Sequence, residues 1–453
     1  MSLEFDKEAS VFKYKVPKGY PDDPIKNFIV DIKYDVAKSL NMDLEDNIIF
    51  ANVSKNDDSI IGLGSRTVGI IEKDMDLTLC SQRCNNKMNN IEGDMYYRTD
   101  IGFNLVISYE NSGVDIEEGN KTVNKIKEHV ESTYNNKVVS KFGDFNGRIS
   151  HQGETFVAST DGVGTKSILV LDYLGKQEGF EMLGQDIVNH CVNDIIVSDA
   201  KPLFFLDYFA GSKINSKEVE AFVKGVSNAC KEVDMILLGG ETAEMPNVYT
   251  ENRYDLVGMI VGTLNKNISI NPDMISENDI VIGLPSSGPH TNSYSLIRKI
   301  LDRYTKLYDK DNIIHIYEQL CKPHMRYYQV ISNILTLKIK IKGLCHITGG
   351  GFEDNPKRIL PKGLTIEYED WDYPEWAKFI QEKGMLSDKQ MKKVFNCGIG
   401  MIMFIDEENL KKLINYEVTD FFRIGKVVKI NKDIEIKKEA DEIKDEEIEE
   451  LIF

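Results

Sequence analysis

Acidic residues and glycines come together at three places where the chain leaves a strand or ends a helix. They are the loop Asp161-Gly162-Val163-Gly164-Thr165-Lys166, the pair Asn193-Asp194, and the loop from Gly239 to Pro246 with Gly240 and Glu241. Glycine lets backbone amides approach an anion, lysine neutralises phosphate oxygens, and carboxylates bind hard divalent cations. If the three acidic places converge, they suit a nucleoside triphosphate held with magnesium ions.

Each of these places also has an ordinary structural interpretation. A glycine turn with surface charges explains the two loops, and a solvated helix face explains Asp186, His190 and Asp194, which lie four residues apart. For any one of these helix residues the solvated face is the better interpretation. Asp194 stands apart because apolar residues and a buried strand follow it. We interpret His190 as a satisfied or exposed histidine.

Later in the chain, glycine-rich loops occur without matching acids. Thr348-Gly349-Gly350-Gly351 precedes a helix-like stretch and is typical of an amide cradle for a phosphate, with a flexible linker as the alternative. His290 follows the turn that begins at Ser286. His290 and His346 can act as an acid or a base, although loop histidines more often serve as hydrogen-bonding spacers.

Alternating strand-like and helix-like stretches position these residues and predict an α/β (α+β) fold. We expect an α/β domain over residues 108–268 and a second over 269–430. Residues 1–107 contain short β-like runs and predict a separate small module. Residues 431–453 form a charged tail that we expect to be a solvated helix or partly disordered.

Composition restricts the function classes. The 453-residue chain carries a net charge of -18, which argues against a nucleic-acid partner. No apolar stretch approaches the roughly 20 residues that span a bilayer, and the N-terminus does not resemble a signal peptide. Seven scattered cysteines suit a reducing compartment. We therefore expect a cytoplasmic protein that uses neither membrane nor nucleic acid.

Taken in order, these motifs resemble the aminoimidazole ribonucleotide synthetase (phosphoribosylformylglycinamidine cyclo-ligase) family over residues 108–430. Besides the loops above, the resemblance rests on further stretches. These are Tyr109, Ser112 to Ile116, Gly119-Asn120, Cys191 to Asp194, Pro202 to Tyr208, Ser286 to His290, Tyr294 to Leu296, Thr348 to Phe352 and Phe395 to Gly398.

The resemblance implies a two-domain fold whose N-terminal sheet pairs with that of a second subunit in a homodimer. It implies ATP-dependent ring closure of formylglycinamidine ribonucleotide, with ATP and Mg²⁺ as cofactors. Catalytic roles would fall to Lys166, Asp161 and His290, and metal binding to Asp161, Asp194 and Glu241. ATP would contact Gly162, Gly164, Thr165, Lys166, Asn193, Asp194, Gly240, Glu241 and Asp115. The substrate would contact His290, Asn292, Thr348, Gly349, Gly350 and Gly351.

Four departures from the family pattern bear on this expectation. Asp199 and Ser293 stand where the family has glycine, the loop that closes over ATP is reduced to Phe142 to Gly147, and Pro323 to Tyr327 differs from the usual sequence. Aspartate tolerates positive φ better than most residues, so we expect Asp199 to keep its turn.

Two rival functions remain from sequence alone. One is a non-catalytic ATP-binding scaffold. The other is a small-molecule kinase of the same superfamily, such as thiamine-monophosphate kinase or selenophosphate synthetase, against which the loops Gly239 to Pro246 and Thr348 to Phe352 argue. Residues 1–107 resemble no family that we identify, and they are an oligomerisation or partner-binding module on this interpretation.

Overall fold

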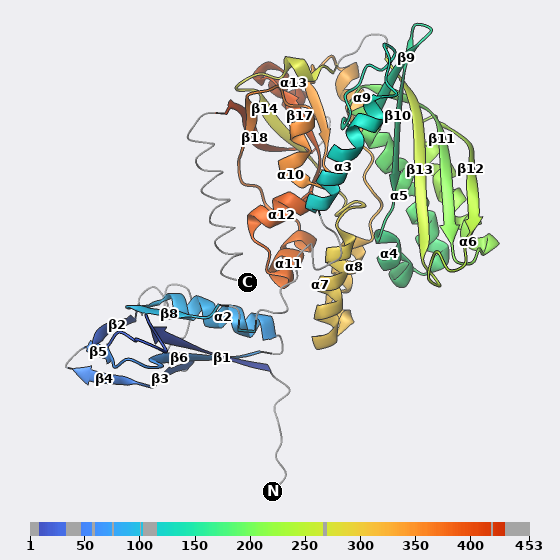
Figure 1. The fold of residues 1–453 in the computed structure, drawn as a ribbon. Helices are drawn as coiled ribbons and strands as arrows, with labels where there is room; N and C mark the ends of the chain where they lie inside the picture. Colours follow the sequence, from blue (N-terminus) through green and yellow to red (C-terminus); the bar gives the residue numbers. More distant parts are fainter. Residues whose placement is uncertain are drawn as a thin grey trace. The chain divides into compact units, whose positions relative to one another are not determined.

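The chain divides into two compact units, with the division between Val106 and Ile107. The computed structural model describes residues 9–32, 47–56, 59–74, 77–99, 101–102, 116–265, 270–417 and 420–430. Asp115 and the tail beyond residue 430 lie outside this described part, so their predicted roles stay predictions. Figure 1 shows the elements of both units, which are described separately below.

Within its described residues, the first unit contains two four-stranded antiparallel sheets and one helix, α2 (Leu77–Asn89). One sheet has the order β3 (Ile48–Phe50), β6 (Val68–Asp74), β1 (Ala9–Pro17), β8 (Met95–Tyr97). The other has the order β4 (Val53–Asn56), β5 (Ser59–Gly62), β2 (Phe28–Ile32), β7 (Ile91–Glu92).

Strand β1 shows how this small core is built. Alternation along the strand buries Val11, Lys13 and Lys15 on one face. The Lys13 ammonium is buried because it donates to Ser81 Oγ at 2.9 Å and to the Thr99 carbonyl at 2.8 Å. These bonds offset the desolvation of the charge.

The second unit begins with a five-stranded sheet covered on one face by helices. Its order is β12 (Ile236–Glu244), β11 (Ala200–Gly211), β13 (Tyr254–Leu264), β10 (Glu154–Gly162), β9 (Gly147–His151). Strands β11 and β12 pair in parallel, and the other pairs are antiparallel. The helices are α4 (Lys166–Leu174), α5 (Lys176–Ile196) and α6 (Ser216–Lys231).

A second, wholly antiparallel sheet follows, in the order β15 (Gly343–His346), β17 (Ile399–Ile405), β14 (Ile280–Pro285), β18 (Phe422–Lys429), β16 (Leu364–Tyr368). Around it lie seven helices: α7 (Tyr294–Leu307), α8 (Ile314–Leu320), α9 (Tyr328–Thr336), α10 (Gly351–Asp354), α11 (Glu375–Gly384), α12 (Asp388–Val394) and α13 (Glu407–Tyr416). Three 3₁₀ turns, η3 (Pro272–Met274), η4 (Lys310–Ile313) and η5 (Pro356–Arg358), complete the described elements.

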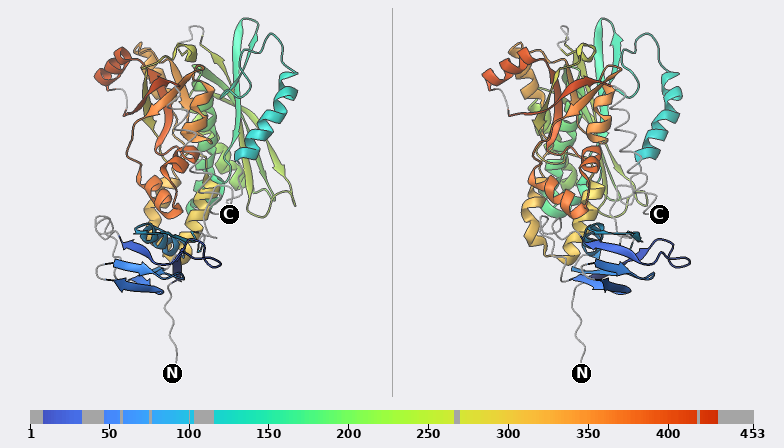
Figure 2. Two further views of the ribbon diagram at one scale, coloured as in Figure 1. Left: turned by 60° about the vertical axis from the view of Figure 1, so that its left-hand side comes forward. Right: turned by 90° about the vertical axis from the view of Figure 1, so that its left-hand side faces the viewer.

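Both halves of the second unit share one hydrophobic core, which runs from Phe145 to Val427. The mixed α/β prediction is confirmed. Helix α3 (Ile116–Glu131) lies on the outside of this unit and is exposed over most of its length (Figure 2). Within the described residues, no helix has both the length and the apolar character needed to cross a bilayer.

Helix α5 is buried on more than its apolar face. Asp186, His190 and Asp194 are 0%, 2% and 6% exposed. The interpretation of this row as a solvated face was therefore wrong for Asp186 and His190. Asp194 lies near the core, as expected from its apolar neighbours, and His190 is a satisfied histidine with Asp161 and Thr291 as partners. The reason is tertiary, because the second half of the unit covers the polar face of α5.

The turn after α5 keeps the conformation that glycine would favour. Asp199 has φ 59° and its carboxylate accepts a hydrogen bond from Asn265 Nδ2 at 2.7 Å. The expectation that Asp199 preserves this turn is confirmed, since a local hydrogen bond compensates an L-residue in the left-handed region.

Candidate active site

Asp161 lies at the end of β10 and contacts α5. Its Oδ1 accepts a hydrogen bond from the Gly162 amide at 2.6 Å, and its Oδ2 lies 2.9 Å from His190 Nε2, as an ion pair. The Asp161 side chain is still 42% exposed. This carboxylate is therefore accessible to solvent or a ligand while the Gly162 amide and His190 fix its orientation.

His190 is enclosed between two carboxylates. Its Nε2 lies 2.9 Å from Asp161 and 3.8 Å from Asp194. Burial lowers the pKa of His190, but the two carboxylates outweigh that effect and raise the pKa to about 9. Burial conversely raises the pKa of Asp161, and His190 outweighs this and leaves it below its usual value. At neutral pH the pair is a carboxylate and an imidazolium.

A directional hydrogen-bond chain links His190 to Asp194 through both halves of the unit. His190 Nδ1 lies 2.6 Å from Thr291 Oγ1, which lies 3.5 Å from His324 Nδ1. His324 Nε2 lies 3.2 Å from His346 Nε2, and His346 Nδ1 lies 2.8 Å from Asp194 Oδ1. With His190 charged, each donor faces an acceptor if His324 carries its proton on Nε2 and His346 on Nδ1.

The remaining cluster histidines have lowered pKa values. Burial is the main cause, and neighbouring imidazoles add to it for His290 and His324; the pKa of His346 falls less because Asp194 partly opposes burial. His290 stacks on His324 with ring centroids 3.9 Å apart. Three neutral imidazoles thus lie beside the charged His190.

Side chains of α5 hold the segment that carries His324 through hydrogen bonds to its backbone. Asp186 Oδ1 accepts from the His324 amide at 2.6 Å, and Asn189 Nδ2 donates to the His324 carbonyl at 2.8 Å. Asn193 donates to the Met325 carbonyl at 2.8 Å and accepts from the Tyr327 amide at 3.0 Å. The side chain of Asn193, predicted to contact ATP, is therefore engaged in joining the two halves.

Lys166, predicted to neutralise transferred phosphate, is fully buried. Its Nζ donates to Asp186 Oδ1 at 2.9 Å and to the Lys322 carbonyl at 2.8 Å. This arrangement does not present the ammonium to a ligand. The adjacent Thr165 Oγ1 lies 3.1 Å from Ser295 Oγ. Gly162 ends β10, and Gly164, with φ 63°, lies in the turn into α4.

Glu241 does not join Asp161 and Asp194. The register pairs Asp161 with Gly258, Gly258 with Asp207, and Asp207 with Gly240. Asp161 and Gly240 are therefore separated by three strand spacings, or roughly 14 Å. Successive side chains of a strand point to opposite faces of the sheet, so Glu241, which follows Gly240, lies on the face opposite to Asp161. Gly240 itself is required for packing, because a Cβ there would lie 2.4 Å from Asp207 Oδ1.

The predicted anion cradle in the second half is largely occupied by side chains. The Thr348 amide donates to Asn355 Oδ1 at 2.7 Å, and the Gly349 amide donates to Asn292 Oδ1 at 3.2 Å. Gly350 and Gly351 have φ values of 93° and 54° and open α10, which is a single turn. The structure thus brings Asn292 to this loop as predicted, but leaves few free amides.

Ser293 departs from the family's glycine and still adopts φ 66° at the start of α7. Its hydroxyl donates to the Val394 carbonyl at 2.6 Å. The turn after His290 is therefore kept, with a hydrogen bond that glycine could not make.

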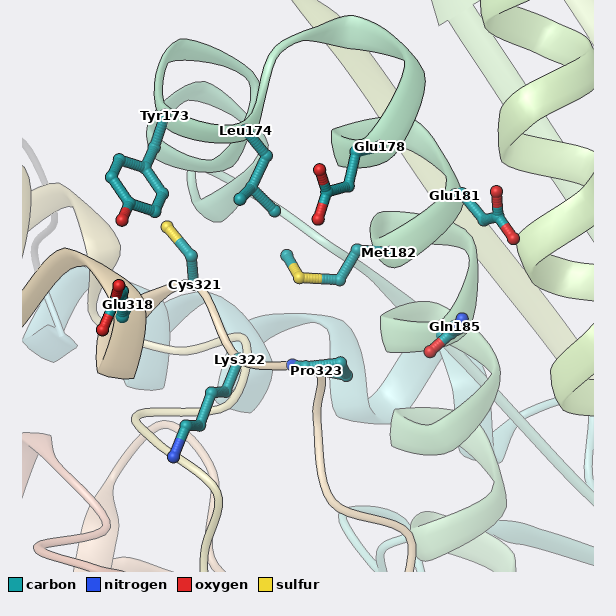
Figure 3. A pocket seen from close by; sticks show the side chains of 10 residues that line it. All are labelled: Tyr173, Leu174, Glu178, Glu181, Met182, Gln185, Glu318, Cys321, Lys322 and Pro323. Carbon is teal, nitrogen blue, oxygen red and sulfur yellow. The ribbon is translucent and has the colours of Figure 1, made fainter. Parts of the chain in front are cut away.

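Two hollows lie on the second unit. One, of about 330 Å³, is lined by Asp144 to Gly147, Ala158 to Thr160, and Met259, and adjoins Asp161 in sequence. The other, of about 480 Å³, is shown in Figure 3: Tyr173, Leu174 and Met182 face Cys321 and Pro323 across it. No predicted site residue lines this second pocket.

Sequence reasoning missed the roles of His190, Thr291, His324 and Asp186. The fourfold spacing on α5 was visible, and His324 lay in a segment already noted as unusual. Spacing alone could not show that the second half of the unit covers α5.

Family models match most of the chain. The model for the N-terminal domain of AIR synthase related protein matches residues 142–264, and that for its C-terminal domain matches residues 276–437. The model for the C domain of phosphoribosylglycinamide synthetase matches residues 10–104, which sequence reasoning had left without a relative.

Curated relatives match over the second unit. The chain is 42% identical over 339 residues to a phosphoribosylformylglycinamidine cyclo-ligase from Prochlorococcus marinus, covering 72% of this chain and 96% of that protein. It is 41% identical over 337 residues to a protein of the same name from Caldicellulosiruptor saccharolyticus, covering 71% and 97%. A solved thiamine monophosphate kinase from Aquifex aeolicus has a TM-score of 0.47 at 16% identity, covering 68% and 94%.

Proposed function

The chain belongs to the phosphoribosylformylglycinamidine cyclo-ligase family, and on this basis we propose that it closes the imidazole ring of aminoimidazole ribonucleotide in purine biosynthesis. In this reaction ATP phosphorylates the formamide oxygen of formylglycinamidine ribonucleotide, and ADP is released. The amidine nitrogen then attacks the carbon that bears this oxygen, and phosphate leaves as the ring closes. The observation that carries the proposal is identity of about 40% over almost the whole length of the relatives. The scaffold and kinase alternatives have no comparable support.

We propose that ATP binds at the hollow lined by Asp144 to Gly147 and Ala158 to Thr160, because Thr160 directly precedes Asp161. This hollow includes the short loop expected to close over ATP. Asp161 is the acidic site residue that combines partial exposure with a fixed orientation. It would hold Mg²⁺, which supplies charge neutralisation for the phosphates when it is bound.

Asp194 and Glu241 would then have different roles from Asp161. Asp194 accepts from Ser159 Oγ at 2.9 Å and from His346, so its oxygens are already engaged and it acts by orienting imidazoles. Glu241 is exposed and lies on the other face of the sheet, where it can meet ligand or a second subunit.

The substrate would lie at the loops of the second half. Asn292 and Gly349 are joined by a hydrogen bond, and His290 lies beside them in sequence at the head of α7. Asn292 Nδ2 has no hydrogen-bond partner among the described residues and can donate to a ribonucleotide phosphate, whereas the Thr348 and Gly349 amides would have to exchange their present partners Asn355 and Asn292 for the phosphate. Transfer of the phosphoryl group from ATP in the first half to the substrate in the second half requires the two molecules to meet over α5.

A homodimer is supported by the uncovered face of the first sheet. Apolar side chains are exposed there on three strands: Ile236 at 64%, Leu238 at 62%, Met259 at 41% and Ile149 at 45%. Apolar sheet faces of this kind are normally buried against another layer. A second copy of the chain that packs through the same face would bury these side chains. Light scattering after size-exclusion chromatography measures the mass of the particle, and we expect that of a dimer.

The deciding experiment is an assay of ADP and phosphate release with ATP and formylglycinamidine ribonucleotide. We expect release only when both are present, together with formation of the aminoimidazole product. Turnover that ignores this substrate but responds to thiamine monophosphate or selenide would favour a related kinase. The match of residues 10–104 covers one domain of phosphoribosylglycinamide synthetase, so it supports no complete synthetase activity here. Seven free cysteines suit the proposed cytoplasmic location.

A further inference from the structure

The lysine expected to meet the transferred phosphoryl group is not free to do so. Lys166 is fully buried, and its ammonium is bound to Asp186 and to the Lys322 carbonyl. Phosphoryl transfer puts negative charge on the oxygens of the moving group, and cationic side chains are among the groups that stabilise it. A different cation that faces the hollow of about 330 Å³ proposed to bind ATP would supply this stabilisation.

Arg358 is a cation that the second half of the unit brings to this ATP hollow. It is the last residue of η5, and its guanidinium carbon lies 4.9 Å from the centroid of the Phe145 ring. Phe145 lines the ATP hollow and belongs to the short loop expected to close over ATP. Arg358 therefore lies within one aromatic ring of the place proposed for the nucleotide.

We propose that Arg358 is a catalytic residue that binds the γ-phosphate of ATP and stays with this group during its transfer. The inference rests on the proposed function, which supplies the acceptor of the phosphoryl group. A guanidinium suits the role because its planar fork of donors matches two oxygens of one phosphate. Its high pKa also keeps it charged throughout the reaction.

The guanidinium of Arg358 is available for a ligand. The residue is exposed, and its side chain has no hydrogen-bond or ion-pair partner in the described ranges of the chain. All of its N–H donors are thus left for oxygens of a phosphate. The contact with the Phe145 ring is weaker than a charge-assisted hydrogen bond, so the guanidinium can turn toward a phosphate at small cost.

Two other cations nearby are already paired with acids. Arg148, directly after the loop, has its guanidinium 2.8 Å from Asp144 in a partly buried ion pair. Lys357 lies 3.1 Å from Asp354 on the surface. These pairings leave Arg358 as the better candidate for the phosphate.

The turn that carries Arg358 also holds the loop proposed to contact the substrate. Asn355 directly precedes η5, and its side chain accepts from the Thr348 amide at 2.7 Å and donates to the Gly349 carbonyl at 3.0 Å. The Arg358 amide donates to the Asn355 carbonyl at 3.2 Å. Arg358 is thus linked to the substrate loop through Asn355 and to the ATP hollow through Phe145, as transfer between the two requires.

The step that Arg358 serves is the phosphorylation of the substrate. A lone pair of the formamide oxygen forms a bond to the γ-phosphorus. The bond from that phosphorus to the β,γ-bridging oxygen breaks, and its electron pair leaves with ADP. The formamide N–H proton passes to water as the imidoyl phosphate forms. The guanidinium donates to the non-bridging oxygens and neither gains nor loses a proton.

The first test measures binding to the full chain and does not depend on turnover. Calorimetry with Mg²⁺ compares the β,γ-methylene analogue of ATP with ADP, for the wild type and for Arg358→Ala. Loss of a charge-assisted hydrogen bond to the γ-phosphate should weaken binding of the analogue about 10-fold or more and leave the affinity for ADP unchanged. Lys357→Ala, at the neighbouring exposed cation, is the matched control and should bind both as the wild type does.

The second test measures ring closure. Arg358→Ala should lower kcat at least about 100-fold with little change in the Michaelis constant for the ribonucleotide, because the contact stabilises the transition state. Arg358→Lys keeps the charge without the fork and should recover part of this loss. Methylguanidine should restore part of kcat to Arg358→Ala and have no such effect on Lys357→Ala. Circular dichroism verifies that each variant folds.

The outcomes separate this inference from the proposed function. Equal weakening of the analogue and of ADP in Arg358→Ala, or equal losses in Arg358→Ala and Lys357→Ala, would overturn the contact with the γ-phosphate. A wild type that closes the ring, with kcat kept in Arg358→Ala, upholds the proposed function and removes Arg358 from it. A wild type that does not close the ring but binds the analogue through Arg358 upholds the γ-phosphate contact and removes the proposed function.

Discussion

Lys166 and Asp186 form an ion pair in which both side chains are fully buried, with Nζ 2.8 Å from Oδ2 and 2.9 Å from Oδ1. The pair joins the first turn of α4 to the middle of α5, and the Lys322 carbonyl completes the ammonium's partners. A lysine that the motif places at a phosphate is thus part of the scaffold in this structure. Its position still borders the site, because Asp186 also holds the His324 amide.

Lys166→Met should destabilise the protein by about 3–5 kcal/mol, because it leaves the Asp186 carboxylate buried without its counter-charge. Lys166→Met combined with Asp186→Asn should recover much of this loss, since asparagine keeps an acceptor for the His324 amide. Urea unfolding measures both. A single variant as stable as the wild type would contradict the structural role and return Lys166 to consideration as a phosphate ligand.

Asp161→Asn should lower turnover about a hundredfold, corresponding to loss of roughly 3 kcal/mol of transition-state stabilisation. The melting temperature should also fall, because Asp161 stabilises the buried imidazolium of His190, so turnover is measured well below the melting temperature of the variant. Asp234→Asn, at a side chain that is 95% exposed, serves as the control and should retain full activity. Near wild-type turnover of Asp161→Asn at saturating Mg²⁺ would remove Asp161 from the metal site.

Gly400→Ala should cost about 1–3 kcal/mol and displace His290, because the added Cβ would lie 2.2 Å from both His290 Cε1 and Tyr327 Oη. We expect the Michaelis constant for the ribonucleotide to rise. Gly119→Ala, on the exposed helix α3 with open space around it, is the matched control and should not destabilise. Unchanged stability of Gly400→Ala would show that the ring is not held against β17.

Stability should be greatest near pH 6.5. The folded-state pKa of His190 is raised from 6.5 to about 9, so its contribution, about 3 kcal/mol, is complete below pH 6.5 and lost as pH rises to 9. His290, His324 and His346 have lowered pKa values, so below pH 6.5 the unfolded state takes up protons that the folded state does not. Stability therefore also falls toward acid pH.

His190→Gln provides the check on the alkaline side of this profile. Removing the imidazolium should flatten the fall in unfolding free energy between pH 6.5 and 9 and leave the acid side in place. Denaturant unfolding at a series of pH values gives the profile. An unchanged alkaline slope in the variant would assign that slope to another group.

A chain beginning at Phe103 should fold, form the homodimer and bind ATP. The core of the second unit and that of the first share no buried apolar residue within the described ranges. Circular dichroism, a cooperative melt and calorimetry with ATP measure the outcome. A truncated protein that melts cooperatively but does not bind ATP would make the first unit a part of the active site.

The sequence by itself determined the family, the α/β class and the loops that carry the motifs, because local spacing, glycine and turn chemistry act over a few residues. Asp161 at a strand end and Asn292 beside the glycine loop follow from such local patterns. Asp199 is a similar case, since the tolerance of aspartate for positive φ is a property of the residue.

Only the tertiary structure decided which of those residues face each other. A segment about 130 residues later in the chain covers the polar face of α5. Its carbonyls bind Lys166, which is buried, and Asn193, and it brings His324 next to His346. Strand order separated Glu241 from Asp161 across the sheet. Pairings over such sequence distances depend on the packing of whole layers, and no motif encodes them locally.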